Sequence, residues 1–252
     1  MRKTTERLAF YVILIGAWAA LARSGFWPDY LFPSPRMVVR ALSEGVANKS
    51  FLIGVAVSLK RIVVGYGISV VGGVLIGLLL GRSERAENTL GSLILGLQTL
   101  PSICWMPAAL LWFGLSEWAI IFVVVLGAVF SIAIATHDGI KNLPPRYIQA
   151  AQNMGSRGWH LYLDVILPGA LPSIAQGLKQ GWSFAWRSLM GAELIFISLG
   201  LGHLLQMGRE LNDMAQVAAV MVVITVLGLA ADRLVFSRFE NSIRVRWGLA
   251  RS

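Results

Sequence analysis

The chain has 252 residues, of which 56% are hydrophobic and 14% are charged, and its formal net charge is +9. Soluble domains carry about 25% charged residues, so most of this surface is predicted to face lipid rather than water. The single cysteine cannot form a disulfide within the chain, and the three histidines lack metal-ligand spacing. No phosphate-binding glycine loop or nucleophile elbow occurs either, so we predict no catalytic residue, no metal site and no cofactor site.

The first predicted membrane span covers residues 8–27. Its apolar run follows a short basic end, and Phe26 and Trp27 supply aromatic residues that favour a membrane interface. The run is also short enough for a signal peptide, with Ala-Leu-Ala at residues 20–22 as its cleavage site. We favour the uncleaved span because further spans follow, and the signal peptide stays as the alternative.

Two elements are predicted next. Apolar residues recur at helical spacing at positions 37, 38, 41 and 42, which indicates an amphipathic helix lying at a surface. A second span is predicted at residues 62–81, because Lys60 and Arg61 interrupt the apolar residues before it. Small residues four apart let helix backbones approach closely in lipid, and this span has glycines at positions 73, 77 and 81.

The third predicted span, residues 90–113, contains Pro101 and Pro107. Because proline removes backbone hydrogen bonds, we expect this helix to bend or to unwind locally. A turn at Pro168 to Pro172 is expected before the fifth span. The remaining spans are predicted at residues 118–136, 169–197 and 214–236, and residues 1–252 are assigned to a single membrane domain.

A polar segment, residues 137–168, separates the fourth and fifth spans. Three residues lie between the Ala-Ala pair at 150–151 and Gly155, and nine more lie between Gly155 and the Val-Ile-Leu-Pro run at 165–168. This pattern resembles the signature loop of ABC-importer permeases: Glu-Ala-Ala, three residues, Gly, nine residues, then Ile-x-Leu-Pro. Gln149 stands in place of the family's glutamate, and the last run begins with valine in place of isoleucine.

The resemblance implies that a separate ATPase grips this segment through a short coupling helix. Ala150, Ala151 and Gly155 would form a small contact face, since 151 and 155 are one helical turn apart, and Gly155 would end the helix. The predicted coupling residues are Arg146, Gln149, Ala150, Ala151, Gly155, Arg157, Leu167 and Pro168.

Further motifs resemble the permeases of nitrate, sulfonate, taurine and bicarbonate importers over roughly residues 28–236. They are Phe-Pro-Ser-Pro at 32–35, Ser-Leu-Lys-Arg at 58–61, Leu-Trp-Phe-Gly at 111–114, Ile-Leu-Pro-Gly-Ala-Leu-Pro at 166–172 and Gly-Ala-Glu-Leu at 191–194. The implied fold is an all-α integral membrane protein with about six transmembrane helices, the type I ABC importer permease fold and a cytoplasmic coupling helix.

The implied partners are a second permease subunit, giving a homodimer, two ATPase subunits that bind ATP and Mg²⁺, an extracytoplasmic solute-binding protein, and the lipid bilayer. The chain itself would be no enzyme. It would lie in the bacterial cytoplasmic (inner) membrane with both termini in the cytoplasm, and the side holding both termini carries more of the basic residues. Because these basic residues cluster at helix ends, anionic lipid headgroups explain them better than nucleic acid does.

Ionisable residues inside a span are costly, so they usually face a cavity or a partner. We predict that Arg187 lines the translocation path and favours a small anion, with Gln98, Ser183 and Glu193 as further path residues. The alternatives are that Arg187 pairs with a carboxylate or reaches the membrane surface, and that Glu193 caps a helix. An integral membrane enzyme using His137, Asp138 and Glu193, or a secondary transporter built from inverted repeats, remains the rival class.

Overall fold

The computed structural model describes residues 2–196 and 198–246, and every regular element among them is a helix. Within these described ranges, five helices are long and apolar enough to cross a membrane: Thr5–Arg23, Ser50–Arg82, Glu117–Lys141, Gly158–Ile195 and Met214–Ile243. A sixth candidate is the pair Glu84–Gln98 and Ser102–Phe113, which is bent by 99°. The prediction of an all-α membrane protein with about six spans is therefore confirmed.

The chain groups into two compact units, which we describe separately. Unit 1 comprises Met1–Leu59 and Glu193–Leu227, and unit 2 comprises Lys60–Ala192 and Gly228–Ser252. The long helices α3, α10 and α12 each continue from one unit into the other.

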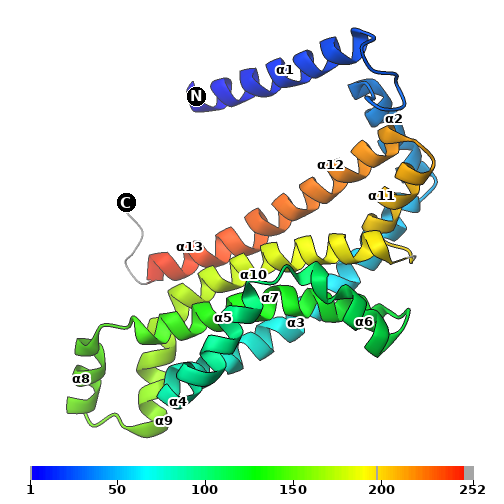
Figure 1. Cartoon of the computed structure of the whole chain (residues 1–252). Helices are drawn as coiled ribbons and strands as arrows, with labels where there is room; N and C mark the ends of the chain where they lie inside the picture. Colours follow the sequence, from blue (N-terminus) through cyan, green and yellow to red (C-terminus); the bar gives the residue numbers. More distant parts are fainter. Residues whose placement is uncertain (1, 197, 247–252) are drawn as a thin grey trace. The chain divides into compact units, whose positions relative to one another are not determined.

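Unit 1 begins with α1 (Arg2–Arg23), whose apolar side chains are exposed along the helix. The amphipathic helix predicted near residue 38 is α2 (Pro35–Ala47), and it buries Val38 while its neighbour Val39 is exposed. Helices α11 (Leu201–Glu210) and α12 (Met214–Ala231) form a hairpin (Figure 1). Residue 212 in this hairpin has φ 55°, a conformation that asparagine tolerates better than most residues.

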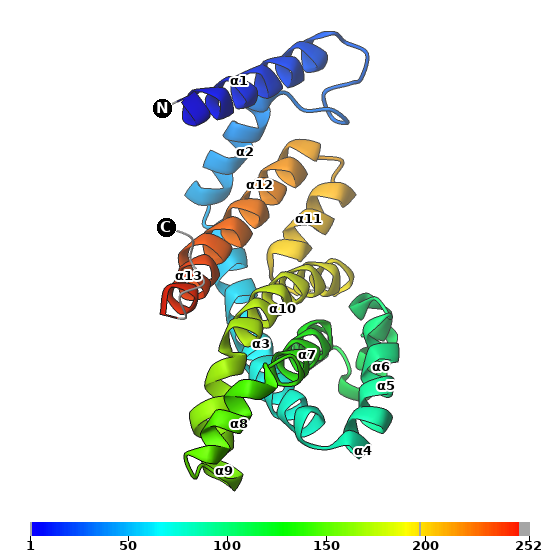
Figure 2. The same cartoon turned by 90° about the vertical axis from the view of Figure 1, so that its left-hand side faces the viewer.

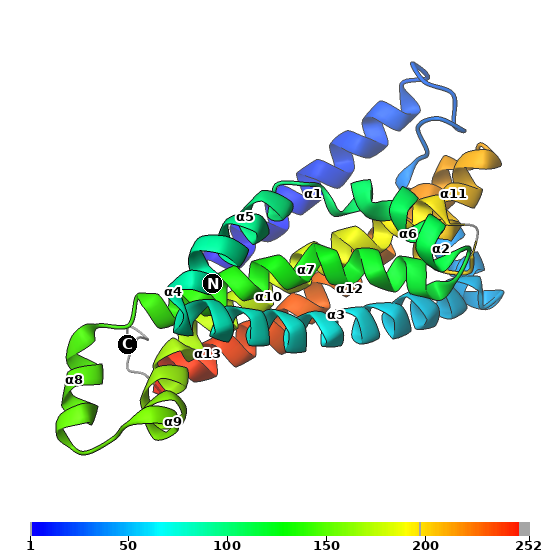
Figure 3. The same cartoon turned by 60° about the horizontal axis from the view of Figure 1, so that its bottom comes forward.

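Unit 2 is built around α7 (Glu117–Lys141), the most buried of the spans. Helix α3 (Ser50–Arg82) lies beside it (Figure 3). A β-carbon added at Gly73 would lie 2.7 Å from Ile132 Cβ and 2.8 Å from the Val129 carbonyl oxygen. Equally close contacts exist at positions 65, 77 and 81, so the predicted role of small residues in close helix packing is confirmed.

The helix that contains the predicted second span is longer than residues 62–81, because α3 starts at Ser50 and runs through Lys60 and Arg61 without a break. Lysine and arginine are good helix formers, so a charged pair does not end a helix. Their charges are balanced by Glu117 at the first turn of α7, at 3.0 Å from Lys60 Nζ and 3.6 Å from Arg61 Nη2.

The third span is broken at Pro101, as predicted. Its first half consists of α4 (Glu84–Ala86), the π-helical turn η1 (Glu87–Gly91) and α5 (Ser92–Gln98). The second half consists of the 3₁₀ turn η2 (Ser102–Trp105) and α6 (Met106–Phe113). Pro107 lies in the first turn of α6, where no helical N–H partner is lost, so it causes no second break.

The expected turn at Pro168 to Pro172 is wrong. Helix α9 (Gly158–Leu161), the π-helical turn η3 (Tyr162–Ile166) and α10 (Leu167–Ile195) form one helical run, with Pro172 inside it. The π-helical turn ends at Ile166, two residues before Pro168, so the irregular hydrogen bonding falls there while the chain stays helical. The predicted end of this span at residue 197 lies outside the described residues.

The sixth span also extends further than residues 214–236. Helix α12 is followed by the π-helical turn η4 (Asp232–Phe236) and α13 (Ser237–Arg246). In unit 2, Lys179 of α10 lies 3.6 Å from an Asp232 carboxylate oxygen and 3.4 Å from one of Glu240, which joins α10 to this end of the chain.

Candidate functional site

The predicted coupling helix is α8 (Pro145–Asn153), which projects with α9 beyond the ends of α7 and α10 (Figure 2). Gly155 follows it with φ 89°. The Gly155 N–H donates to the Gln152 carbonyl at 3.0 Å, and the Ser156 N–H donates to the Ala151 carbonyl at 2.9 Å. This is a Schellman motif with glycine at the left-handed position, so Gly155 ends the helix as predicted.

The predicted contact face does not include Ala151, which is 4% exposed. The helix packs against its own return segment, α9 and η3, and Ala151 lies on that buried side. Gln149, Ala150 and Gly155 are exposed, as are the flanking Arg146 and Arg157.

Two exposed apolar residues of this segment were missed by the sequence analysis. Tyr147 is 55% exposed and Met154 is 82% exposed, although both lie outside the membrane spans. Tyr147, Ala150 and Met154 are three and four positions apart, so they share one side of α8. That spacing in an otherwise polar segment was a readable signal. We call these three residues the α8 docking face.

A hydrophobic cluster fixes the projecting segment to the body of unit 2. It consists of buried Ile140, Ile166, Ala170 and Ile174, and Leu167 packs against it. Pro168 lies half-buried in the first turn of α10. Because side chains from α7, η3 and α10 share this cluster, the two ends of the projecting segment are packed together.

A cluster of polar and charged side chains joins the first half of the broken span to the end of α7. Lys141 Nζ lies 2.6 Å from one Glu87 carboxylate oxygen, and His137 Nε2 lies 3.2 Å from the other. His137 Nδ1 lies 3.1 Å from Asp138. The proposed enzyme residues His137 and Asp138 thus lie in a cluster of polar and charged side chains at the end of α7.

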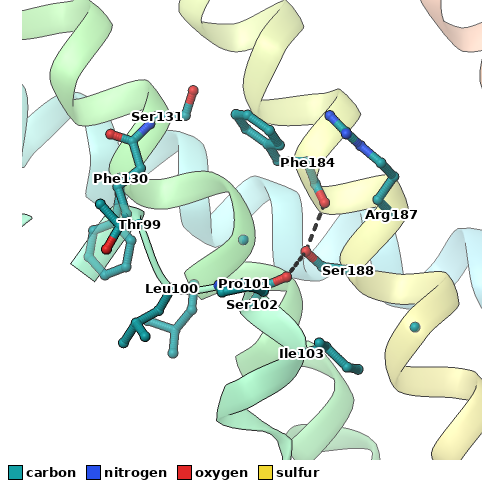
Figure 4. A pocket seen from close by; sticks show the side chains of 14 residues that line it. Thr99, Leu100, Pro101, Ser102, Ile103, Phe130, Ser131, Phe184, Arg187 and Ser188 are labelled. Atoms are coloured by element: carbon teal, nitrogen blue, oxygen red, sulfur yellow. Dashed lines mark hydrogen bonds between the residues drawn. The ribbon is translucent and has the colours of Figure 1, made fainter. Parts of the chain in front are cut away.

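A cavity of about 440 Å³ lies in unit 2 where the broken span meets α7 and α10 (Figure 4). The break at Pro101 forms one wall, α7 contributes Phe130 and Ser131, and α10 contributes Phe184, Arg187 and Ser188. Its lining residues are Gln98, Thr99, Leu100, Pro101, Ser102, Ile103, Leu126, Gly127, Phe130, Ser131, Phe184, Arg187, Ser188 and Gly191. Two of the four predicted path residues, Gln98 and Arg187, are therefore brought together.

Glycine at position 127 permits the close approach of α7 and α10 beside this cavity, because a β-carbon there would collide with the Ser188 side chain. Ser188 Oγ donates to the Phe184 carbonyl at 2.8 Å and lies 2.6 Å from Ser102 Oγ. This pair of hydroxyls ties the first residue after the Pro101 break to α10.

The exposed side of α10 is polar throughout unit 2. Between Leu167 and Ala192, the exposed residues are Gln176, Gln180, Ser183 and Arg187. Their spacing of four, three and four places them on one side of the helix, which we call the α10 polar stripe. A second cavity of about 290 Å³ beside it is lined by Gln176 and Gln180 from the stripe, and by Gln98, Ser131 and Asp138.

The remaining predicted path residue, Glu193, belongs to unit 1 and does not line either cavity. Its side chain is 0% exposed and accepts hydrogen bonds from Ser58 Oγ at 2.7 Å and from the Gly202 N–H at 3.0 Å. Ser58 Oγ in turn accepts from the Leu201 N–H at 2.9 Å. The two side chains therefore cap the N-terminus of α11, where a negative charge is favourable.

Together, these features define a multi-pass membrane protein with polar cavities and a projecting helical segment. Solved structures include similar folds. One is a chain from the crystal structure of an amino acid ABC transporter, which aligns with a TM-score of 0.67 at 19% sequence identity. The alignment covers 80% of this chain and 97% of that chain. A chain of the MetNI methionine ABC transporter, in an inward-facing conformation, aligns with a TM-score of 0.68 at 20% identity, covering 77% of this chain and 96% of that one. The fold is the type I ABC importer permease fold, as predicted.

The chain belongs to the family described as binding-protein-dependent transport system inner membrane component, whose model matches residues 73–240. A putative ABC transporter permease of Methanocaldococcus jannaschii is 34% identical over 75% of this chain and 72% of its own length. The putative aliphatic sulfonates transport permease SsuC of Escherichia coli is 32% identical over 94% of this chain and 89% of its own length. The chain is therefore a permease component of an ABC importer, and the rival membrane-enzyme and secondary-transporter classes are set aside.

Proposed function

We propose that the solute crosses the membrane along the α10 polar stripe and through the cavity beside it. The observation that carries this proposal is the composition of the exposed side of α10: Gln176, Gln180, Ser183 and Arg187, with no apolar residue among them between Leu167 and Ala192. A polar side facing hydrocarbon is costly, so this side faces water or a second protein surface.

Coupling runs through α8. A separate ATPase binds the α8 docking face, and Arg146 and Arg157 supply charge-assisted contacts to it. Gly155 ends the helix beside this face. ATP binding closes the ATPase dimer, the two α8 helices move together, and the paired permeases change from inward- to outward-facing. The hydrophobic cluster around Ile140 and Leu167 supports this step, since it transmits the movement of α8 to α7 and α10.

The assembly contains two copies of this chain, two ATPase subunits that bind ATP and Mg²⁺, and an extracytoplasmic solute-binding protein. Both termini lie in the cytoplasm. Binding of a solute-loaded protein on the outside stimulates ATP hydrolysis inside, and this chain supplies the path and the lever without bond chemistry of its own.

The solute is a small anion of the sulfonate or taurine kind, with nitrate and bicarbonate as related candidates. The name of the 32% identical relative refers to aliphatic sulfonates, and that of another relative, 28% identical over 92% of this chain, refers to taurine. The positive charge of Arg187 beside the cavity agrees with an anion.

The test compares Gly155→Glu with wild type in the complete complex, purified with its ATPase and binding protein and placed in nanodiscs. A glutamate at φ 89° is strained and adds a charge beside the docking face, so stimulated ATP hydrolysis should fall at least tenfold or the subunits should no longer copurify. Gly155→Asn is the matched control, because asparagine tolerates this conformation and should retain most activity. Unchanged stimulation in a folded Gly155→Glu complex contradicts coupling through this segment.

A further inference from the structure

We propose that the 440 Å³ cavity is an oxyanion-binding site within the permease itself, with Arg187 supplying the charge and Gln98 and Ser131 supplying hydrogen-bond donors. The proposal rests on the proposed translocation path. It adds that this chain selects the solute, alongside any selection by a binding protein.

Three hydroxyl groups in the cavity wall already donate their hydrogen bonds within the protein. Thr99 Oγ1 donates to the Gly96 carbonyl at 2.7 Å, and Ser188 Oγ donates to the Phe184 carbonyl at 2.8 Å. Since each hydroxyl has one proton, Ser102 must be the donor in its 2.6 Å contact with Ser188. These three hydroxyls hold the wall of the cavity together and have no donor left for a bound molecule.

The side chains of Gln98, Ser131 and Arg187 keep hydrogen-bond donors that can reach a ligand. Gln98 and Ser131 make no side-chain hydrogen bond to any other described residue, although Ser131 is only 5% exposed. Because Ser131 lines the cavity, water or a ligand there can satisfy its hydroxyl group. Both residues also line the neighbouring 290 Å³ cavity, so they stand where the two cavities meet.

Arg187 is held in a way that leaves its two terminal nitrogens free. Its Nε donates to the Ser183 carbonyl at 3.1 Å, and its guanidinium carbon lies 4.9 Å from the centre of the Phe184 ring. Within the described part of the chain no carboxylate forms an ion pair with it, so the alternative of a paired structural arginine is not supported there. A guanidinium fixed at Nε and stacked on an aromatic ring presents its remaining fork to a bidentate acceptor.

The charge and size of the cavity define the class of ligand. Arg187 is the single charged residue among the 14 that line the cavity (Figure 4). A volume of 440 Å³ lies in the range of small-molecule sites, about 300–1,000 Å³. A small molecule with a sulfonate or carboxylate group matches the fork of Arg187 and the neutral donors of Gln98 and Ser131, whereas a cation finds no counter-charge in the lining.

The experiment measures ligand binding to the complete permease–ATPase complex in nanodiscs, without binding protein, by saturation-transfer NMR. The probes are ethanesulfonate, propionate and the neutral ethyl methyl sulfone. Wild type should bind the two anions and not the sulfone. Arg187→Gln should weaken anion binding at least tenfold, Arg187→Lys should give an intermediate loss because the fork is missing, and Ser131→Ala should cause a loss of a few fold.

Arg238→Gln is the matched control, since it removes an exposed positive charge from α13 and should leave anion binding unchanged. ATP hydrolysis and copurification of each variant are measured in parallel. Equal binding of anions and sulfone, or unchanged anion binding in Arg187→Gln, overturns the oxyanion site. If the ATPase fails to copurify with wild type, the proposed function fails instead, so the two failures are distinguishable.

Discussion

Two helices of unit 2 have exposed sides of opposite character. Between Ile62 and Gly81, the exposed residues of α3 are all apolar or glycine: Val63, Val64, Gly67, Ile68, Val71, Leu75 and Leu79. On α10 the exposed residues between Leu167 and Ala192 are all polar. Both helices bury their other sides against α7.

The comparison shows that hydropathy averaged over a span says little about its surroundings. Both helices qualify as membrane spans, yet only α3 presents a surface that hydrocarbon accepts. The side that each helix leaves exposed is more informative: it suits lipid on α3, whereas on α10 it suits water or a second protein surface, in line with the proposed solute path.

The largest expected effect comes from placing an arginine on each side. Leu75 is 61% exposed on α3, and Leu75→Arg should cost about 2.5–3.5 kcal/mol, because a charge near the centre of a span faces hydrocarbon. Gln180→Arg on the α10 polar stripe should lower the free energy of unfolding by less than about 1 kcal/mol, because water along the stripe can solvate the added guanidinium. Thermal unfolding of both variants in nanodiscs measures the difference. Equal costs would falsify the assignment of the two faces.

The second comparison is between the buried and exposed sides of α3, where replacing a glycine by alanine adds one methyl group to either side. Gly73→Ala forces a β-carbon to within 2.8 Å of the Val129 carbonyl oxygen, so we expect a loss of about 1–3 kcal/mol. Gly67→Ala is the matched control, because nothing lies within 4 Å of its added β-carbon. That variant should be neutral or slightly stabilising, as alanine favours helix over glycine by about 1 kcal/mol. Chemical unfolding of the two variants checks the order, and a Gly73→Ala protein as stable as wild type argues against close packing on α7.

The spans and several local features were predictable because they depend on short stretches of sequence. The break at Pro101 and the helix end at Gly155 follow from what proline and glycine do to the backbone. The α10 polar stripe could also have been predicted, since the polar residues at positions 176, 180, 183 and 187 repeat at helical spacing.

Other features depended on partners distant in sequence. Glu193 caps α11 together with Ser58, which is 135 positions away, so its role could not be read from its place in a span. Likewise, Ala151 is buried because α8 folds back on its own return segment. Pro172 remains helical because the irregular turn forms earlier, at Tyr162–Ile166, and neither the position nor the type of that turn is marked in the sequence.

The smallest expected effect concerns the polar stripe alone. Gln180→Leu removes an amide from the path without creating a charge or a steric clash, so the folded protein should be as stable as wild type or slightly more stable. ATP-driven uptake of ethanesulfonate into proteoliposomes should fall by a few fold, which corresponds to about 1 kcal/mol in the barrier.

Val71→Leu on the exposed side of α3 is the control for this last change, because it exchanges one apolar residue for another on the face assigned to lipid. It should leave both stability and uptake unaltered. A Gln180→Leu protein that transports at the wild-type rate would mean that the stripe packs against a second protein surface and that solute passes elsewhere. A loss of uptake with unchanged stability supports a role of the stripe in the solute path. A stripe that packs against a second protein surface predicts the opposite result: the complex assembles less well, whereas transport per assembled complex is unchanged.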